Sequence, residues 1–269
     1  MNVTERLRTA PEPDVAVETD PAARRALVIE LVIVGVLTFG FSALSALLSL
    51  IDAQLSAGGI GSTTVAINPK QADVGWIDLI RQLMSASRLL AIGALAVYLL
   101  WRSGLKLGTL GLGRPQRRDV PPGLALAALI GLPGLGLLAA AKALGLNADL
   151  VASQNDGPWW QYVTLVLMAI GNAVAEEIVV VAYFLVRLKQ LGVGKNSSLA
   201  ASAVLRGGYH LYQGFGGGLG NLVMGVVFGR WYQATGRVWP LVIAHAVIDV
   251  VAFLGYALLH DHLGFVTGS

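Results

Sequence analysis

Six ionisable side chains lie inside long apolar stretches of this sequence. They are Glu176, Glu177, Arg206, His210, His245 and Asp249. Burying a charge near the centre of a bilayer costs about 2.5–3.5 kcal/mol on insertion scales, so such residues face a protein interior or an aqueous cavity and often mark function. Carboxylates and imidazoles are common general acids and bases. The pattern therefore predicts a site for acid–base chemistry inside a membrane protein.

Glu176 and Glu177 are adjacent in the apolar run 173–183. Neighbouring side chains of an α-helix point about 100° apart, so one carboxylate can face a cavity while the other faces a neighbouring helix. A carboxylate in such a place can serve as a general base. The alternative is a helix end at the membrane interface, where a charge costs little. About ten apolar helical residues on each side of the pair argue against that alternative.

The two histidines each have an ionisable neighbour one helical turn away. Arg206 precedes His210 by four residues, and His245 precedes Asp249 by four. Residues at this spacing share a helix face, and a carboxylate there can fix the tautomer of the imidazole. A single membrane histidine can equally make an interhelical hydrogen bond. Two histidines on separate helices, together with a glutamate pair on a third, favour convergence on one site.

The composition indicates the elements that hold these residues. Of the 269 residues, 55% are hydrophobic and only 13% are charged. A helix needs about 20 apolar residues to cross a bilayer, so the sequence predicts an all-α transmembrane bundle that crosses about seven to eight times. The expected spans are 27–50, 89–101, 122–144, 162–185, 198–212, 219–232 and 239–259. Residues 76–88 are expected to form an interfacial or re-entrant helix.

The chain ends and the loops predict the domain organisation and the orientation of the protein in the membrane. The polar, proline-interrupted residues 1–26 predict a disordered cytoplasmic tail, followed by a single membrane domain over 27–269. Most of the 19 Lys and Arg residues, Arg187 among them, fall in segments on the side of the N-terminus. The positive-inside rule then places the N-terminus in the cytoplasm. His260 and His262 are expected to be interfacial or solvated.

Two features of the composition exclude other kinds of protein. The basic residues follow the loops and form no single patch, which excludes a nucleic-acid partner. The absence of cysteine excludes disulfides and thiol chemistry. The expected partners are the lipid bilayer and a membrane-associated peptide or protein substrate.

The ionisable residues resemble the motifs of the CAAX-protease and bacteriocin-processing family of intramembrane proteases, also called CPBP or Abi proteins. Members share Glu-Glu-x-x-x-Arg, Phe-x-x-x-His and His-x-x-x-Asn/Asp on three membrane helices. The matching stretches here are 176–181, 206–210 and 245–249, and 110–114 is similar to a basic turn of the family. The motif-bearing part covers about residues 160–260.

The resemblance implies an eight-helix bundle around a cavity and an endopeptidase of the bacterial plasma membrane. It implies that Glu176 activates water with the support of Glu177. It also implies that His210 and His245 are water or metal partners, with Asp249 beside His245. Some members of the family cleave prenylated CaaX tails.

Two positions depart from the family pattern. Val181 stands where the family has arginine, and Arg206 stands where it has phenylalanine. We hypothesise that Arg206 supplies the missing positive charge from a neighbouring helix, since two carboxylates beside an arginine cost less than two alone. This hypothesis requires the guanidinium to lie within about 6 Å of the glutamate side chains.

Two peptidase mechanisms fit the sequence. Zn²⁺ or another divalent metal could be held by His210, His245 and Glu177 and activate water. In the second mechanism, Glu176 and His210 activate water without a metal, while His245 and residue 249 donate to the oxyanion. An ionised Asp249 cannot donate, which favours the metal. The sequence also fits two functions without peptide hydrolysis: a catalytically inactive peptide-binding, immunity or scaffold protein, and a small transporter.

Overall fold

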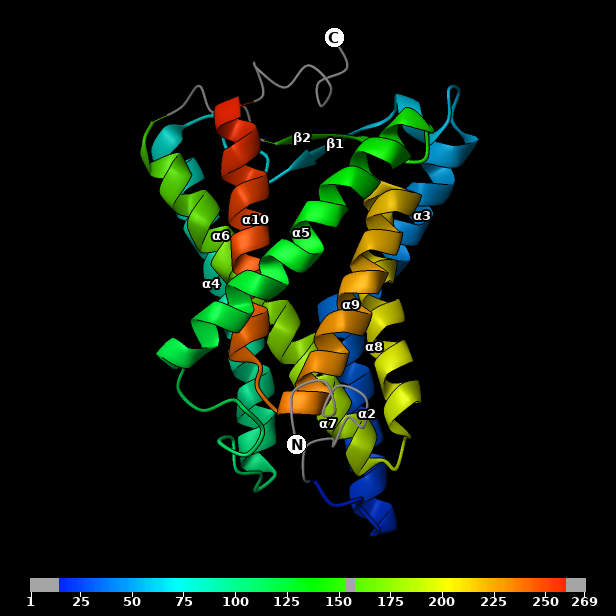
Figure 1. Cartoon of the computed structure of the whole chain (residues 1–269), viewed down its shortest axis with the longest axis vertical. Coiled ribbons are helices and arrows are strands. Elements are labelled where there is room, and N and C mark those ends of the chain that lie inside the picture. Colours follow the sequence, from blue (N-terminus) through cyan, green and yellow to red (C-terminus); the bar gives the residue numbers. More distant parts are fainter. Residues whose placement is uncertain (1–14, 153–157, 260–269) are drawn as a thin grey trace.

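The computed structural model describes residues 15–152 and 158–259 as a bundle of helices that run along its long axis, with α5 crossing the others obliquely (Figure 1). The helices are α2 (Pro21–Gly35), α3 (Phe41–Leu55), α4 (Gly75–Arg102), α5 (Val120–Ala143), α6 (Trp160–Glu176), α7 (Phe184–Gln190), α8 (Lys195–Tyr209), α9 (Phe215–Thr235) and α10 (Trp239–Leu259). Two π-helical segments, Val36–Gly40 and Glu177–Tyr183, join α2 to α3 and α6 to α7. The predicted helical membrane bundle is confirmed.

Two short strands stand outside the helical pattern. Strand β1 (Thr64–Ile67) pairs in parallel with β2 (Asp149–Ala152). They lie at the end of the bundle opposite to the start of α2 (Figure 1). The strands tie the α3–α4 connection to the α5–α6 connection, a link that the sequence analysis did not predict.

Among the described residues, four helical stretches are long and apolar enough to cross a membrane. They are Pro21–Leu55, Gly75–Arg102, Arg117–Ala143 and Trp160–Gln190. In the most apolar window of Trp160–Gln190, 72% of the residues are buried, against 11%, 22% and 17% in the other three. Trp160–Gln190 is therefore the central helix of the bundle, and most residues in the windows of the other three are at least partly exposed.

The second predicted span differs from the structure. Residues 76–88 form no separate interfacial helix, because they begin the single 28-residue helix α4. Their polar side chains misled the prediction, since some of them point inward. Asp78 is only 1% exposed, and its Oδ1 accepts hydrogen bonds from the backbone N–H groups of Gln71 and Ala72. These bonds fold the preceding loop onto the start of α4.

The first helix begins earlier than predicted. Asp20 caps α2 by accepting a hydrogen bond from the Ala23 N–H at 2.7 Å, and Pro21 occupies the first helical position, where proline is favoured. Residues 21–26, assigned to the tail from the sequence, are therefore helical. Residues 1–14 of the predicted tail, and His260 and His262, lie outside the described residues.

Close helix packing brings α8 against α9. A Cβ on Gly225 would lie 2.8 Å from the Ala203 Cα, and one on Gly207 would lie 2.9 Å from the Gly218 carbonyl oxygen. Small residues allow helix backbones to approach in this way in membranes. Because α8 also packs against the central helix, its polar side chains reach the middle of the bundle.

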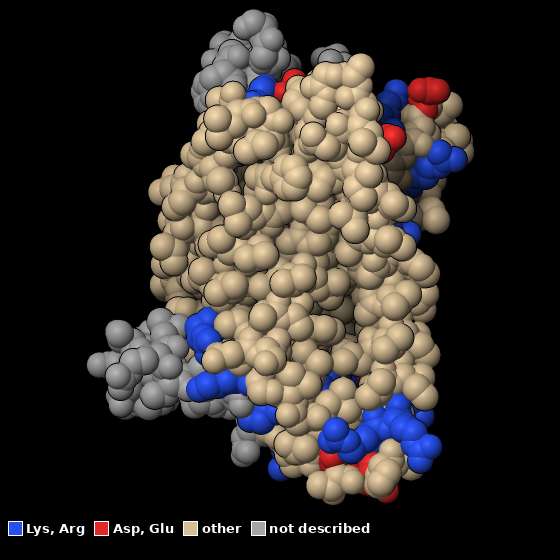
Figure 2. Space-filling model, turned by 90° about the vertical axis from the view of Figure 1, so that its right-hand side faces the viewer, with Lys and Arg blue, Asp and Glu red and all other residues tan. Residues whose placement is uncertain are grey.

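The charged residues gather at the ends of the molecule. Figure 2 shows Lys and Arg side chains towards both ends of the long axis and a broad band between them that is largely free of charge. The start of α2, the α4–α5 connection and the end of α7 share one end (Figure 1). A belt of this kind matches the hydrocarbon region of a bilayer.

Candidate active site

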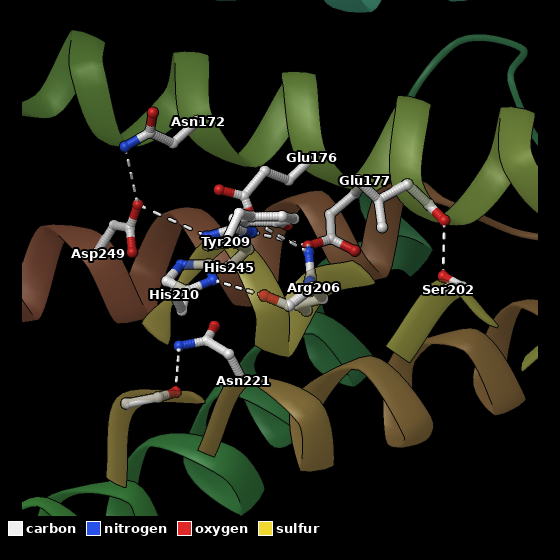
Figure 3. Close-up of polar contacts among 12 residues, drawn as sticks. Asn172, Glu176, Glu177, Ser202, Arg206, Tyr209, His210, Asn221, His245 and Asp249 are labelled. Atoms are coloured by element: carbon white, nitrogen blue, oxygen red, sulfur yellow. Dashed lines mark hydrogen bonds and ion pairs between the residues drawn. The ribbon is translucent and has the colours of Figure 1, made fainter. Parts of the chain in front are cut away.

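Three helices bring the predicted residues together around the middle of the bundle (Figure 3). Glu176 ends α6 and Glu177 begins the π-helical segment, while α8 contributes Arg206 and is followed directly by His210. Helix α10 contributes His245 and Asp249. The structure therefore joins all six residues through a continuous set of contacts from three helices.

Arg206 lies between the two glutamates. Its Nη2 is 3.4 Å from Oε2 of Glu176 and is in direct contact with Oε1 of Glu177. Arg206 and Glu177 are both fully buried, and Glu176 is 9% exposed. The distance that our hypothesis required is therefore met. Val181, where the family has arginine, is fully buried in the apolar core.

The guanidinium of Arg206 is not fully paired. Its Nε and Nη1, together with Oε2 of Glu177, have no hydrogen-bond partner among the residues that the structure describes. The Phe228 ring lies 5.6 Å from the Arg206 Cζ, so one face of the cation meets an aromatic surface. Buried groups without partners are unusual and often accompany a functional role.

His245 and His210 have different surroundings. In His245, Nδ1 is 2.7 Å from Oε1 of Glu177 and Nε2 is 3.6 Å from Oδ2 of Asp249. In His210, Nδ1 is 3.0 Å from the Arg206 carbonyl oxygen. A carbonyl oxygen can only accept, so Nδ1 of His210 carries the hydrogen and its Nε2 keeps the lone pair. His210 is therefore suited to accept a proton at Nε2.

The π-helical segment forms part of the contact between α8 and the central helix. Wide turns of this kind are rare and are frequently found at functional sites. The Ser202 hydroxyl of α8 donates to the Val180 carbonyl oxygen at 2.6 Å, in the middle of the segment (Figure 3). This bond lies one helical turn from Arg206 and helps to fix the position of Arg206 beside the glutamates.

Two residues of this site were missed from the sequence. The Tyr209 hydroxyl donates to Oε2 of Glu176 at 2.6 Å, and its ring lies 4.6 Å from that of His210. The Asn172 Nδ2 lies 3.4 Å from Oδ2 of Asp249. Neither side chain carries a charge, so the search for costly ionisable residues passed over both. Their positions, next to His210 and one turn before Glu176, were the available signal.

The predicted metal ligands do not fit a metal in this arrangement. In the parts of the chain that the structure describes, no three His, Asp or Glu side chains are placed to hold a metal ion. Both nitrogens of His245 face carboxylates, whereas a metal-binding imidazole points one lone pair at the ion. Oε1 of Glu177 is occupied by Arg206 and His245. The metal stays a prediction.

A helical membrane bundle with paired carboxylates and two histidines at its centre defines the class of polytopic membrane proteins with a buried polar site. The family model of the type II CAAX prenyl endopeptidase Rce1-like proteins matches residues 158–251, which contain all six predicted residues. This segment, about a third of the chain, is similar to the CAAX-protease family, and the predicted resemblance is confirmed. Comparison with curated proteins gave no match, and comparison with solved structures gave none either.

Proposed function

We propose that the protein is an active intramembrane endopeptidase that hydrolyses a peptide bond in a membrane-associated peptide or protein. The observation that carries this proposal is the placement of Glu176. Arg206 and Tyr209 both bind its Oε2, which leaves Oε1 to bind a water molecule. A fixed carboxylate with one oxygen available is what a general base requires.

The proposed reaction uses one water molecule. Glu176 accepts a proton as the water oxygen attacks the carbonyl carbon of the scissile bond, and the electron pair of the C=O bond moves to its oxygen. When the C–N bond breaks, the proton passes to the leaving nitrogen. We assign His210 a share in this proton transfer, because the bond of its Nδ1 to the Arg206 carbonyl oxygen leaves the lone pair on Nε2. Glu177 remains paired with Arg206 and His245 and supports the site.

The main alternative is a catalytically inactive relative that binds a membrane peptide, confers immunity or scaffolds a complex. Val181, where the family has an arginine, favours this alternative. The contact of Arg206 with both glutamates weighs against it, because the positive charge is retained from another helix.

Purified protein in lipid nanodiscs tests this choice. The substrates are a quenched-fluorescent library of membrane peptides and a CaaX peptide with and without its prenyl group. We expect Glu176→Gln to slow hydrolysis by about 10²–10⁴-fold, the usual contribution of a general base. Glu30→Gln removes another carboxylate from an apolar helix, away from the site, and should keep the rate of the folded protein. Peptide binding by wild-type protein without cleavage would establish the inactive alternative.

We also propose that the protein lies in a bacterial plasma membrane, crosses it about seven to eight times and keeps its N-terminus in the cytoplasm. The support is the concentration of Lys and Arg in the segments on the N-terminal side of the bundle. Because the chain lacks cysteine, single cysteines at Ser103 and Gly145 can be labelled from either side of the membrane. Labelling of Ser103→Cys from outside would overturn the orientation.

A further inference from the structure

The proposed mechanism lacks a hydrogen-bond donor for the carbonyl oxygen of the scissile bond, because the third motif ends in the acidic Asp249. Amide hydrolysis develops negative charge on the carbonyl oxygen, and hydrogen-bond donors aimed at that oxygen usually provide a large part of the rate. An ionised Asp249 accepts hydrogen bonds and would repel that charge. Another side chain must therefore supply a donor at this position.

Asn172 is the donor that lies next to Asp249. It belongs to α6 and precedes Glu176 by four residues, so the two side chains project from the same face of the helix. Its Nδ2 lies 3.4 Å from Oδ2 of Asp249 (Figure 3). The carboxylate fixes the orientation of the amide, because the reverse orientation would place Oδ1 against a second acceptor.

The other donors of the cluster are either hydrogen-bonded within it or fully buried. The Tyr209 hydroxyl donates to Glu176, and Nη2 of Arg206 is held by the two glutamates. Nε and Nη1 of Arg206 have no partner among the described residues, but Arg206 is fully buried, whereas Asn172 is partly exposed. An amide nitrogen carries two hydrogens, so Nδ2 of Asn172 retains one after it donates to Asp249.

We propose that Asn172 is a catalytic residue that donates its second Nδ2–H to the carbonyl oxygen of the scissile bond, with Asp249 holding the amide in place. This inference rests on the proposed peptidase function. As water adds to the carbonyl carbon and Glu176 takes its proton, the electron pair displaced from the C=O bond settles on the oxygen that faces Asn172. The bond shortens as the charge develops and relaxes when the C–N bond breaks.

The test compares two asparagines. Asn172→Ala should lower kcat by about 10²–10³-fold, the loss seen when one oxyanion donor is removed, with KM changed little. Asn221→Ala is the matched control and should leave kcat unchanged, since the amide of Asn221 donates to the Gly217 carbonyl oxygen of its own helix at 3.1 Å. Thermal unfolding of both variants should match that of the wild-type protein.

A rescue experiment separates a donor from a residue that only orients Asp249. In the double variant Asn172→Ala/Asp249→Asn, the amide returns on the facing helix and should raise kcat at least about tenfold above Asn172→Ala. Full activity of Asn172→Ala, or a loss that Asp249→Asn does not restore, overturns the inference while the proposed function stands. A wild-type protein that hydrolyses no peptide overturns the proposed function and this inference with it.

Discussion

Two arginines are buried in the described part of the bundle, Arg187 and Arg206, and each meets a glutamate and a tyrosine. Arg187 of α7 is fully buried, and each of its three nitrogens has a partner. Nε is 2.9 Å from Oε1 of Glu30, Nη1 is 2.7 Å from Oε1 of Gln190, and Nη2 is 3.0 Å from the Leu99 carbonyl oxygen. The Tyr183 hydroxyl donates to Oε1 of Glu30 at 2.8 Å. This network fastens the central helix to α2 and α4.

The network of Arg206 uses the same three residue types in a different way. Arg206 faces two carboxylates, and two of its nitrogens have no partner within the described part of the chain. Fully paired buried charges stabilise a fold, whereas incompletely paired ones cost free energy and are often kept for function. From this comparison we infer a structural role for Arg187 and a role in the proposed active site for Arg206.

Removal of Arg206 should have the largest effect. Arg206→Met leaves Glu176 and Glu177 together without a cation, and breaking a buried pair in this way costs about 3–5 kcal/mol. We expect a matching loss of free energy of unfolding in a denaturant titration, together with loss of hydrolysis. A stable Arg206→Met protein would contradict the assignment of Arg206 as the charge partner.

A compensating change sharpens this prediction. Arg206→Phe combined with Val181→Arg restores the family residues at both positions, and it should be more stable than Arg206→Phe alone. We expect recovery of at least about 1.5 kcal/mol, the lower value for a hydrogen bond to a charged group. No recovery would show that position 181 cannot reach the glutamates in this chain.

Removal of Arg187 should have a smaller effect, on stability alone. Arg187→Met leaves Glu30 without its cation, but the Glu30 side chain is 26% exposed and can reach polar surroundings. We expect a loss of about 1–3 kcal/mol in free energy of unfolding. The kcat of the folded fraction should be unchanged, and a selective fall in kcat would remove the contrast between the two arginines.

Removing the hydroxyl group of Tyr209 or of Tyr183 gives a matched pair of variants, and we expect smaller effects from them. Tyr209→Phe removes a hydrogen bond from Glu176, and we expect kcat to fall about tenfold, which corresponds to about 1.4 kcal/mol. Tyr183→Phe removes the equivalent bond from Glu30 and should lower the free energy of unfolding by about 1 kcal/mol without changing kcat. Equal effects of both changes on kcat would contradict the separation of the networks.

A chelator should have the smallest effect of all. Both nitrogens of His245 face carboxylates, so we expect 1,10-phenanthroline and EDTA to leave kcat/KM unchanged. Hydrolysis rates before and after dialysis against chelator, with and without added Zn²⁺, provide the measurement. Loss of activity that Zn²⁺ restores would show that His210, His245 and Glu177 rearrange around a metal.

The sequence predicted the convergence of the ionisable residues better than it predicted their surroundings. One adjacent pair of glutamates and two pairs of ionisable residues at a spacing of four identified three helices and six side chains, and the structure brings those side chains together. Arg187 was treated as a loop cation because it follows the apolar run, yet it is fully buried. Asn172 and Tyr209 were missed because uncharged polar residues change the hydropathy of an apolar run only slightly. Their importance depends on which helices are neighbours.

The π-helical segment Glu177–Tyr183 lies between the two arginine networks. It sets the angle, about the helix axis, between the direction of Glu176 and that of Arg187. Glu176 lies immediately before it and Arg187 follows it on the same continuous helix. Deleting one residue within the segment would rotate everything beyond it by about 100° relative to the glutamates. Arg187 would then turn away from Glu30 while Glu176 kept its place. Substitutions are therefore expected to be tolerated in this apolar segment more readily than any change in its length.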